Sequence, residues 1–252
     1  MGLGGCRMIM KIVEWLVSHL LEILVIMFLI HFASLGHKMG TNKSLVYLFQ
    51  FIIAIALAAY IAPNMVKILT DITDIDKFVK GNFLGKIDGY SNISSNATRE
   101  QAEMLINGLG VPNTVKTAIL KYKDVQSIWN GIGVSNTSDY IAFFLSNIII
   151  NIFSFLIWFV AVAFAIKIVV KKYDWMSKIP EDRGVGPLLG AGVFIFVGLM
   201  FLWLACLLIY ALSGITIGHA ILDKINSSPI LGTIYKTNFV EYLIKYSIYE
   251  LY

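Results

Sequence analysis

Charged residues are scarce in this chain. Lysine, arginine, aspartate and glutamate together make up 14% of its 252 residues, whereas a soluble domain carries roughly 25%. Hydrophobic residues make up 58% of the chain, and the mean hydropathy is +0.75. A single water-soluble core cannot bury that many apolar side chains. The composition therefore excludes an ordinary soluble domain and indicates an integral membrane protein.

Cysteines and the motifs of catalysis are also rare or missing in the sequence. The two cysteines, Cys6 and Cys206, lie far apart, which excludes a disulfide framework and a cysteine-based zinc site. The sequence has no glycine-rich phosphate loop, no Gly-x-Ser-x-Gly elbow and no His-Glu-x-x-His metal motif. We therefore predict no catalytic residue, no metal and no cofactor, and we expect a protein that is not an enzyme.

A concentrated basic face is missing as well. The net charge of +4 is spread in short clusters, a pattern that argues against a nucleic-acid partner. The lipid bilayer is the partner that the composition predicts first.

Long apolar runs are what the sequence has instead. A transmembrane helix needs about 20 mostly apolar residues. Four segments meet this length: 12–35, 44–70, 139–170 and 186–213. We therefore predict an all-α integral membrane protein with four transmembrane helices. Trp203 and Tyr210 lie near the end of the last segment, where aromatic side chains are expected to meet the lipid headgroups.

The remaining segments are not expected to span the membrane. They are an N-terminal extension (1–11), an extracellular loop region (71–138) and a tail (214–252). Short amphipathic helices are predicted in the loop region around Ile106 and Ile119, with apolar faces that either lie on the membrane or cap the bundle. The tail is predicted to be amphipathic and interfacial.

The two short connections between predicted helices are basic. Residues 36–43 carry two lysines and residues 171–183 carry three. The positive-inside rule assigns such connections to the cytoplasm. Four crossings then leave both termini and the 71–138 region outside. We expect an N-out, C-out multi-pass protein.

Polar side chains within the predicted spans mark positions of interest, because they are costly in lipid. His19 and Glu22 share one face of the first span, and Asn147, Asn151 and Ser154 form a stripe along the third. One interpretation is a polar path in a small proton-coupled transporter or channel subunit that uses Glu22. The alternative is a set of hydrogen bonds that hold the helices together.

Small residues recur four apart in two of the spans. Ala54, Ala58 and Ala62 follow one face of the second, and Gly186 and Gly190 open the fourth. Such spacing permits close approach of two backbones. It predicts a tight bundle or a dimer.

Several of these motifs follow one another in a recognisable order. They are Glu22, Gly36-His37-Lys38-Met39-Gly40, Ala62-Pro63, Asp182-Arg183, Gly186 and Gly190, and a tail with Ser228, Tyr235 and Asn238. From residue 12 onward this order resembles the colicin V production protein (CvpA) family, although that family commonly has an aspartate where Glu22 stands. The 71–138 region is longer than in compact members and is similar to the enlarged forms of Gram-positive bacteria.

The resemblance implies a function but no reaction. It implies a non-enzymatic protein of the bacterial plasma (inner) membrane that assists colicin V or bacteriocin (toxin) production or secretion and maintenance of the cell envelope. We expect partners among secretion or envelope proteins, or a second copy of the chain.

Overall fold

The structure, a computed structural model, describes eight stretches of the chain. They are residues 19–72, 103–104, 106–107, 116–117, 119–120, 137–180, 185–212 and 216–241. Every regular element in these stretches is helical, as the sequence predicts. The main helices are α2 (Leu20–Ile72), α7 (Thr137–Lys172), α8 (Gly186–Leu212), α9 (Thr216–Ser227) and α10 (Pro229–Lys236). The predicted extension 1–11, most of 71–138 and the end of the tail lie outside the described residues.

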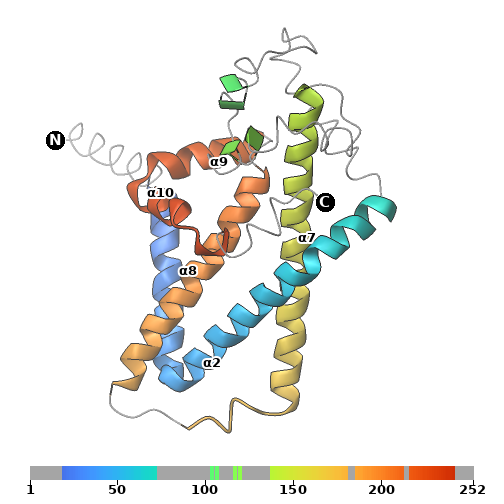
Figure 1. Cartoon of the computed structure of the whole chain (residues 1–252). Helices are drawn as coiled ribbons and strands as arrows, with labels where there is room; N and C mark the ends of the chain where they lie inside the picture. The colour runs from blue at the N-terminus through green and yellow to red at the C-terminus, as the bar shows by residue number, and fades with distance from the viewer. Residues whose placement is uncertain are drawn as a thin grey trace, which may run out of the picture.

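The longest helix, α2, is bent into two arms. Gly40 is the residue inside it with non-helical backbone angles, φ 75° and ψ 176°. A positive φ of this kind carries little steric cost for glycine because glycine has no Cβ. Residues 20–39 form the first arm and 41–72 the second, and the arms meet in a sharp bend (Figure 1). The expected eight-residue connection at 36–43 is thus replaced by a turn at a single residue.

Three helices of the described chain are long and apolar enough to cross a membrane. The spans are Leu20–Val66 within α2, Asp139–Lys172 in α7 and Gly186–Ala211 in α8. With a rise of about 1.5 Å per residue, the 36 residues of α7 extend about 54 Å. This length exceeds the roughly 30 Å of bilayer hydrocarbon, so α7 is long enough to cross it at a tilt or with residues to spare.

The outer surface of these helices is apolar. Large side chains that a soluble protein would bury are exposed, among them Tyr60 (78%), Leu188 (72%), Phe164 (64%) and Ile30 (63%). An exposed apolar surface of this extent marks a protein or membrane contact. Because it is carried by helices of spanning length, it supports a lipid-facing exterior.

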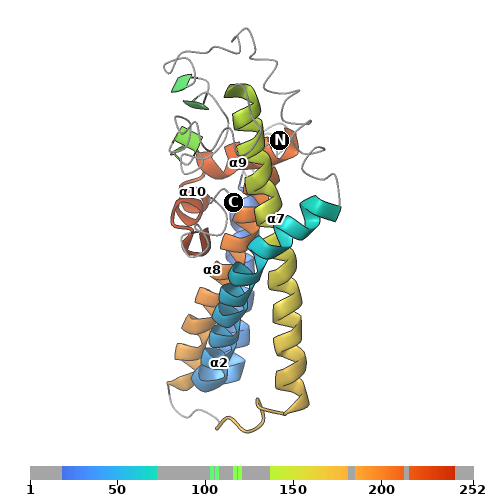
Figure 2. The same ribbon diagram turned by 45° about the vertical axis from the view of Figure 1, so that its right-hand side comes forward.

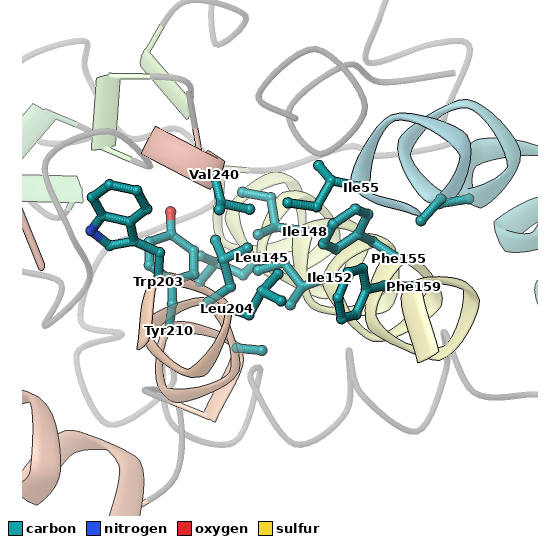
Figure 3. Packing of buried hydrophobic residues seen from close by; sticks show 14 of the residues in the cluster. Ile55, Leu145, Ile148, Ile152, Phe155, Phe159, Trp203, Leu204, Tyr210 and Val240 are labelled. Atoms are coloured by element: carbon teal, nitrogen blue, oxygen red, sulfur yellow. The ribbon is translucent and has the colours of Figure 1, made fainter. Parts of the chain in front are cut away.

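The interior is a single apolar cluster centred on α7. Figure 3 shows Leu145, Ile148 and Ile152 of α7 between side chains of α2 and α8. Trp203 and Tyr210 of α8 belong to this cluster and are only 8% and 5% exposed. They were expected near the lipid headgroups, but the structure turns both side chains into the protein. Hydropathy alone does not show whether an apolar side chain faces the membrane or the protein interior, because both surroundings are apolar.

The small-residue stripe of α2 and two residues of the 71–138 region are also buried. Ala54, Ala58 and Ala62 are at most 2% exposed and belong to the same cluster, so the chain itself covers this face of the second arm. Ile106 and Ile119 are fully buried in it as well. These two side chains therefore pack against the bundle.

The bundle has two chemically different ends. The bend of α2, the end of α7 and the start of α8 lie together at one end (Figures 1 and 2), which we call the basic end because it carries the predicted basic connections. The start of α2, the start of α7, α9 and α10 lie toward the other end, which we call the tail end.

Candidate functional site

At the basic end, α2 and α8 cross through direct contact of their backbones. A Cβ atom on Gly36 would lie 2.2 Å from the carbonyl oxygen of Gly190, and one on Gly190 would lie 2.5 Å from the oxygen of Gly36 and 2.7 Å from that of Gly40. Atoms of a real side chain do not come this close to a backbone. Three glycines of the predicted motif thus meet at one point, where only glycine fits.

Side-chain hydrogen bonds connect the bend to the neighbouring connection. The hydroxyl of Thr41 donates to the carbonyl oxygen of Gly186 at 2.7 Å, and the amide of Asn42 donates to that of Pro180 at 3.4 Å. The buried Ser44 hydroxyl lies 3.5 Å from the oxygen of Gly36, across the bend. The bend of α2 and the connection between α7 and α8 are therefore linked to each other by a hydrogen bond. Asp182 and Arg183, which the resemblance singles out, lie outside the described residues.

At the tail end, the chain folds back onto its own beginning. The hydroxyl of Ser228 donates to Oε1 of Glu22, 206 positions earlier in the sequence. The Ser228 hydroxyl oxygen itself accepts a hydrogen bond of 3.1 Å from the backbone N–H of Leu231. Ser228 is therefore the N-cap of α10, with Pro229 in the first turn. An acidic side chain is favoured at this position because helix N–H groups point toward it.

A second contact fixes the tail to α8. The Nδ2 of Asn238 donates to the carbonyl oxygen of Trp203 at 3.1 Å, and the indole Nε1 of Trp203 donates to the carbonyl oxygen of Ile234 at 3.0 Å. The Oδ1 of Asn238 in turn accepts from the N–H of Glu241 at 2.9 Å. Asn238 is 8% exposed. The reciprocal bonds hold a tail segment against a helix of spanning length.

Tyr235 lies beside this contact in α10. Burial raises the pKa of its phenol, and the neighbouring Tyr210, Glu241 and Cys206 contribute in the same direction. Its hydroxyl is buried and has no hydrogen-bond partner among the described residues.

The polar stripe of α7 faces a different element. The buried Ser154 hydroxyl donates to the carbonyl oxygen of Ala62 in the second arm of α2 at 3.1 Å, next to Pro63, which lies inside that helix. Asn151 is 2% exposed and Asn147 is half-buried. The stripe thus lies on the inner side of α7.

The predicted polar site is therefore divided in two. Glu22 is bonded to Ser228 of the tail, whereas Ser154 is bonded to the second arm of α2. His19, one turn before Glu22, is half-buried, and its carbonyl oxygen accepts from Ile23 N at 3.0 Å. The described residues contain no group of three or more His, Cys, Asp or Glu side chains that could hold a metal ion.

Sequence reasoning named several of these residues without their partners. The resemblance singled out Ser228 and Asn238. Nothing in the sequence indicated that Ser228 bonds to Glu22 or that Asn238 bonds to Trp203. The one available hint was the N-cap pattern Ser228-Pro229, which places a helix start there. Comparisons of the chain with protein-family models, curated proteins and solved structures find no match.

Proposed function

We propose that the chain crosses the bilayer four times, with the basic end in the cytoplasm and both termini outside. The first arm of α2, residues 20–39, is about 30 Å long at about 1.5 Å per residue, which matches the hydrocarbon thickness of roughly 30 Å. The second arm is longer and runs back from the bend at Gly40. Together with α7 and α8, the two arms make four crossings. The location of both short basic connections at one end of the bundle supports this arrangement.

We also propose that the protein works without catalysis, as a CvpA-like factor of a bacterial inner membrane. In this role it assists production or secretion of a bacteriocin-type toxin and maintenance of the envelope. The observation that carries the proposal is the contact between Ser228 and Glu22. Two residues of the resemblance, from opposite ends of the chain, bond to each other. A third, Asn238, joins the same tail to α8, and Gly36, Gly40 and Gly190 form the crossing.

The contacts of the polar residues favour this role over transport. A polar path would be supported by bonds between Glu22 and the stripe of α7. Instead, Glu22 binds Ser228 and Ser154 binds Ala62. Both bonds connect helices to one another, which is the packing role of polar groups in membranes.

A deletion strain tests the proposed role. We expect it to export less of its own peptide toxin and to leak an impermeant nucleic-acid dye under mild detergent stress. The wild-type gene and a Gly192→Ala variant should restore both properties, because a Cβ at Gly192 meets no atom within 4 Å. Normal toxin export and normal dye exclusion in the deletion strain would contradict the proposal.

The Glu22→Gln variant separates the two functions. Glutamine keeps an oxygen that can accept a hydrogen bond from Ser228, but its side chain cannot bind and release a proton as a carboxyl group does. We expect this variant to restore toxin export and dye exclusion. Loss of both properties in a variant that is still inserted at wild-type level would favour a proton-coupled transporter.

A further inference from the structure

The connection after α7 exposes two aromatic side chains beside lysines. Tyr173 is 54% exposed and Trp175 is 52% exposed, and their ring centroids lie 6.4 Å apart with 32° between the planes. The Lys172 ammonium lies 5.9 Å from the centre of the Tyr173 ring. An indole and a phenol next to a cation form a surface that is apolar and positively charged at once.

Local hydrogen bonds hold this surface in place. The N–H of Trp175 donates to the carbonyl oxygen of Val170 at 3.2 Å, across Asp174, whose φ is 48°. This is the geometry of a helix C-terminus closed by a left-handed residue. The hydroxyl of Ser177 lies 2.9 Å from the carbonyl oxygen of Asp174 and also donates to its carboxylate. Trp175 therefore projects from a turn with its own internal support.

Positive charge dominates the described part of the basic end. Its lysines in residues 36–45, 168–180 and 185–190 are Lys38, Lys43, Lys171, Lys172 and Lys178. Asp174 is the one acidic residue in those ranges, and Ser177 already bonds its carboxylate. The bond from Asn42 to the oxygen of Pro180 joins the bend to this connection. The connection continues with Glu181, Asp182 and Arg183, which lie outside the described residues.

We propose that Tyr173, Trp175 and the adjoining lysines form a binding surface for the headgroups of anionic phospholipids in the cytoplasmic leaflet. The inference rests on the proposed crossing of the membrane, because that arrangement sets this end at the level of the headgroups. Lysines there attract an anionic leaflet, and indole and phenol rings favour the interface between headgroup and hydrocarbon. The same turn supplies both, with the aromatic pair directly beside Lys172.

Lipid retention by the purified full-length chain tests the proposal. The chain in a non-ionic detergent is titrated with dioctanoyl-phosphatidylglycerol or dioctanoyl-phosphatidylcholine, and bound lipid is counted by native mass spectrometry. The wild-type chain should retain phosphatidylglycerol in preference to phosphatidylcholine. Replacing Lys171, Lys172 and Lys178 by glutamine should weaken that binding roughly a hundredfold, since each lysine near an anionic surface contributes about fivefold. Trp175→Ala should weaken retention of both lipids.

Matched variants keep the test decisive. Lys224→Gln with Lys236→Gln removes two exposed charges from the tail helices and should leave phosphatidylglycerol binding unchanged. If the triple glutamine variant is misfolded by circular dichroism, the triple arginine variant takes its place and should bind as the wild type does.

Several results would overturn the proposal. Equal retention of the two lipids is one, and equal losses in the basic-end and tail variants are another. Displacement of phosphatidylglycerol by millimolar inorganic phosphate would identify a site for free phosphate instead of a lipid surface. The micelle experiment does not depend on which end faces the cytoplasm. Its failure is therefore separable from a failure of the proposed topology.

Discussion

Replacing Gly190 by alanine adds one methyl group at the point where α2 and α8 touch. The new Cβ would lie 2.5 Å from the oxygen of Gly36 and 2.6 Å from the carbonyl carbon of Gly40. Restoring the 3.4 Å of an ordinary contact requires the backbones to separate by about 0.9 Å. Overpacking of this kind costs about 1–3 kcal/mol, and the obstructing atoms are backbone atoms that cannot rotate away. We expect this overpacking in Gly190→Ala to lower the free energy of unfolding by about 2 kcal/mol before the gain in helix propensity is counted.

Gly192→Ala in the same helix is the matched control. A Cβ there meets no atom within 4 Å, so the change leaves packing intact and gains up to about 1 kcal/mol of helix propensity. Both variants replace a helical glycine by alanine, so the propensity gain cancels when they are compared. Reversible unfolding in mixed dodecyl-sulfate micelles, followed by circular dichroism, measures the difference, which we expect to be about 2 kcal/mol. Equal stability of the two variants would refute the close crossing.

Three further changes test the contacts that hold the tail and α7. Ser154→Ala removes a buried interhelical hydrogen bond and should lower the free energy of unfolding by about 0.6–2 kcal/mol in the same assay; an unchanged value would remove that bond from the account. Asn238→Ala abolishes bonds to two backbone groups, costs about 1–3 kcal/mol, and should expose the tail to protease before the rest of the chain unfolds. Tyr235→Phe deletes a buried hydroxyl and should raise the unfolding temperature, whereas a lower temperature would reveal a partner for that hydroxyl.

Periodicity and hydropathy were sufficient for the helical class and for the long apolar helices. Predicted segments 139–170 and 186–213 correspond to α7 and α8 as the structure has them. The reason is physical: a helix that must satisfy its own backbone in lipid needs an uninterrupted apolar run of known length. Such a run is visible in a single sequence.

The tail contacts could not be predicted in the same way. Ser228 and Glu22 are far apart in the sequence, and nothing in the pattern around either residue identifies the other. Trp203 shows the related difficulty. An aromatic residue near the end of an apolar helix suits the headgroup region as well as a protein interior, and its inward position follows from Asn238 and Ile234. The bend was predicted too long because Gly40 reverses the chain without a loop.

The central claim is that the basic end and the tail end lie on opposite sides of a membrane that the chain crosses four times. Cysteine accessibility tests it in a cysteine-free background. Single cysteines replace Gly5, Lys38, Met104, Lys178 and Ser227 in turn, and intact cells are treated with a membrane-impermeant maleimide before and after permeabilisation. The account predicts labelling of positions 5, 104 and 227 in intact cells, and labelling of positions 38 and 178 only after permeabilisation. Labelling of position 38 from the same side as position 5 or position 227 would contradict it.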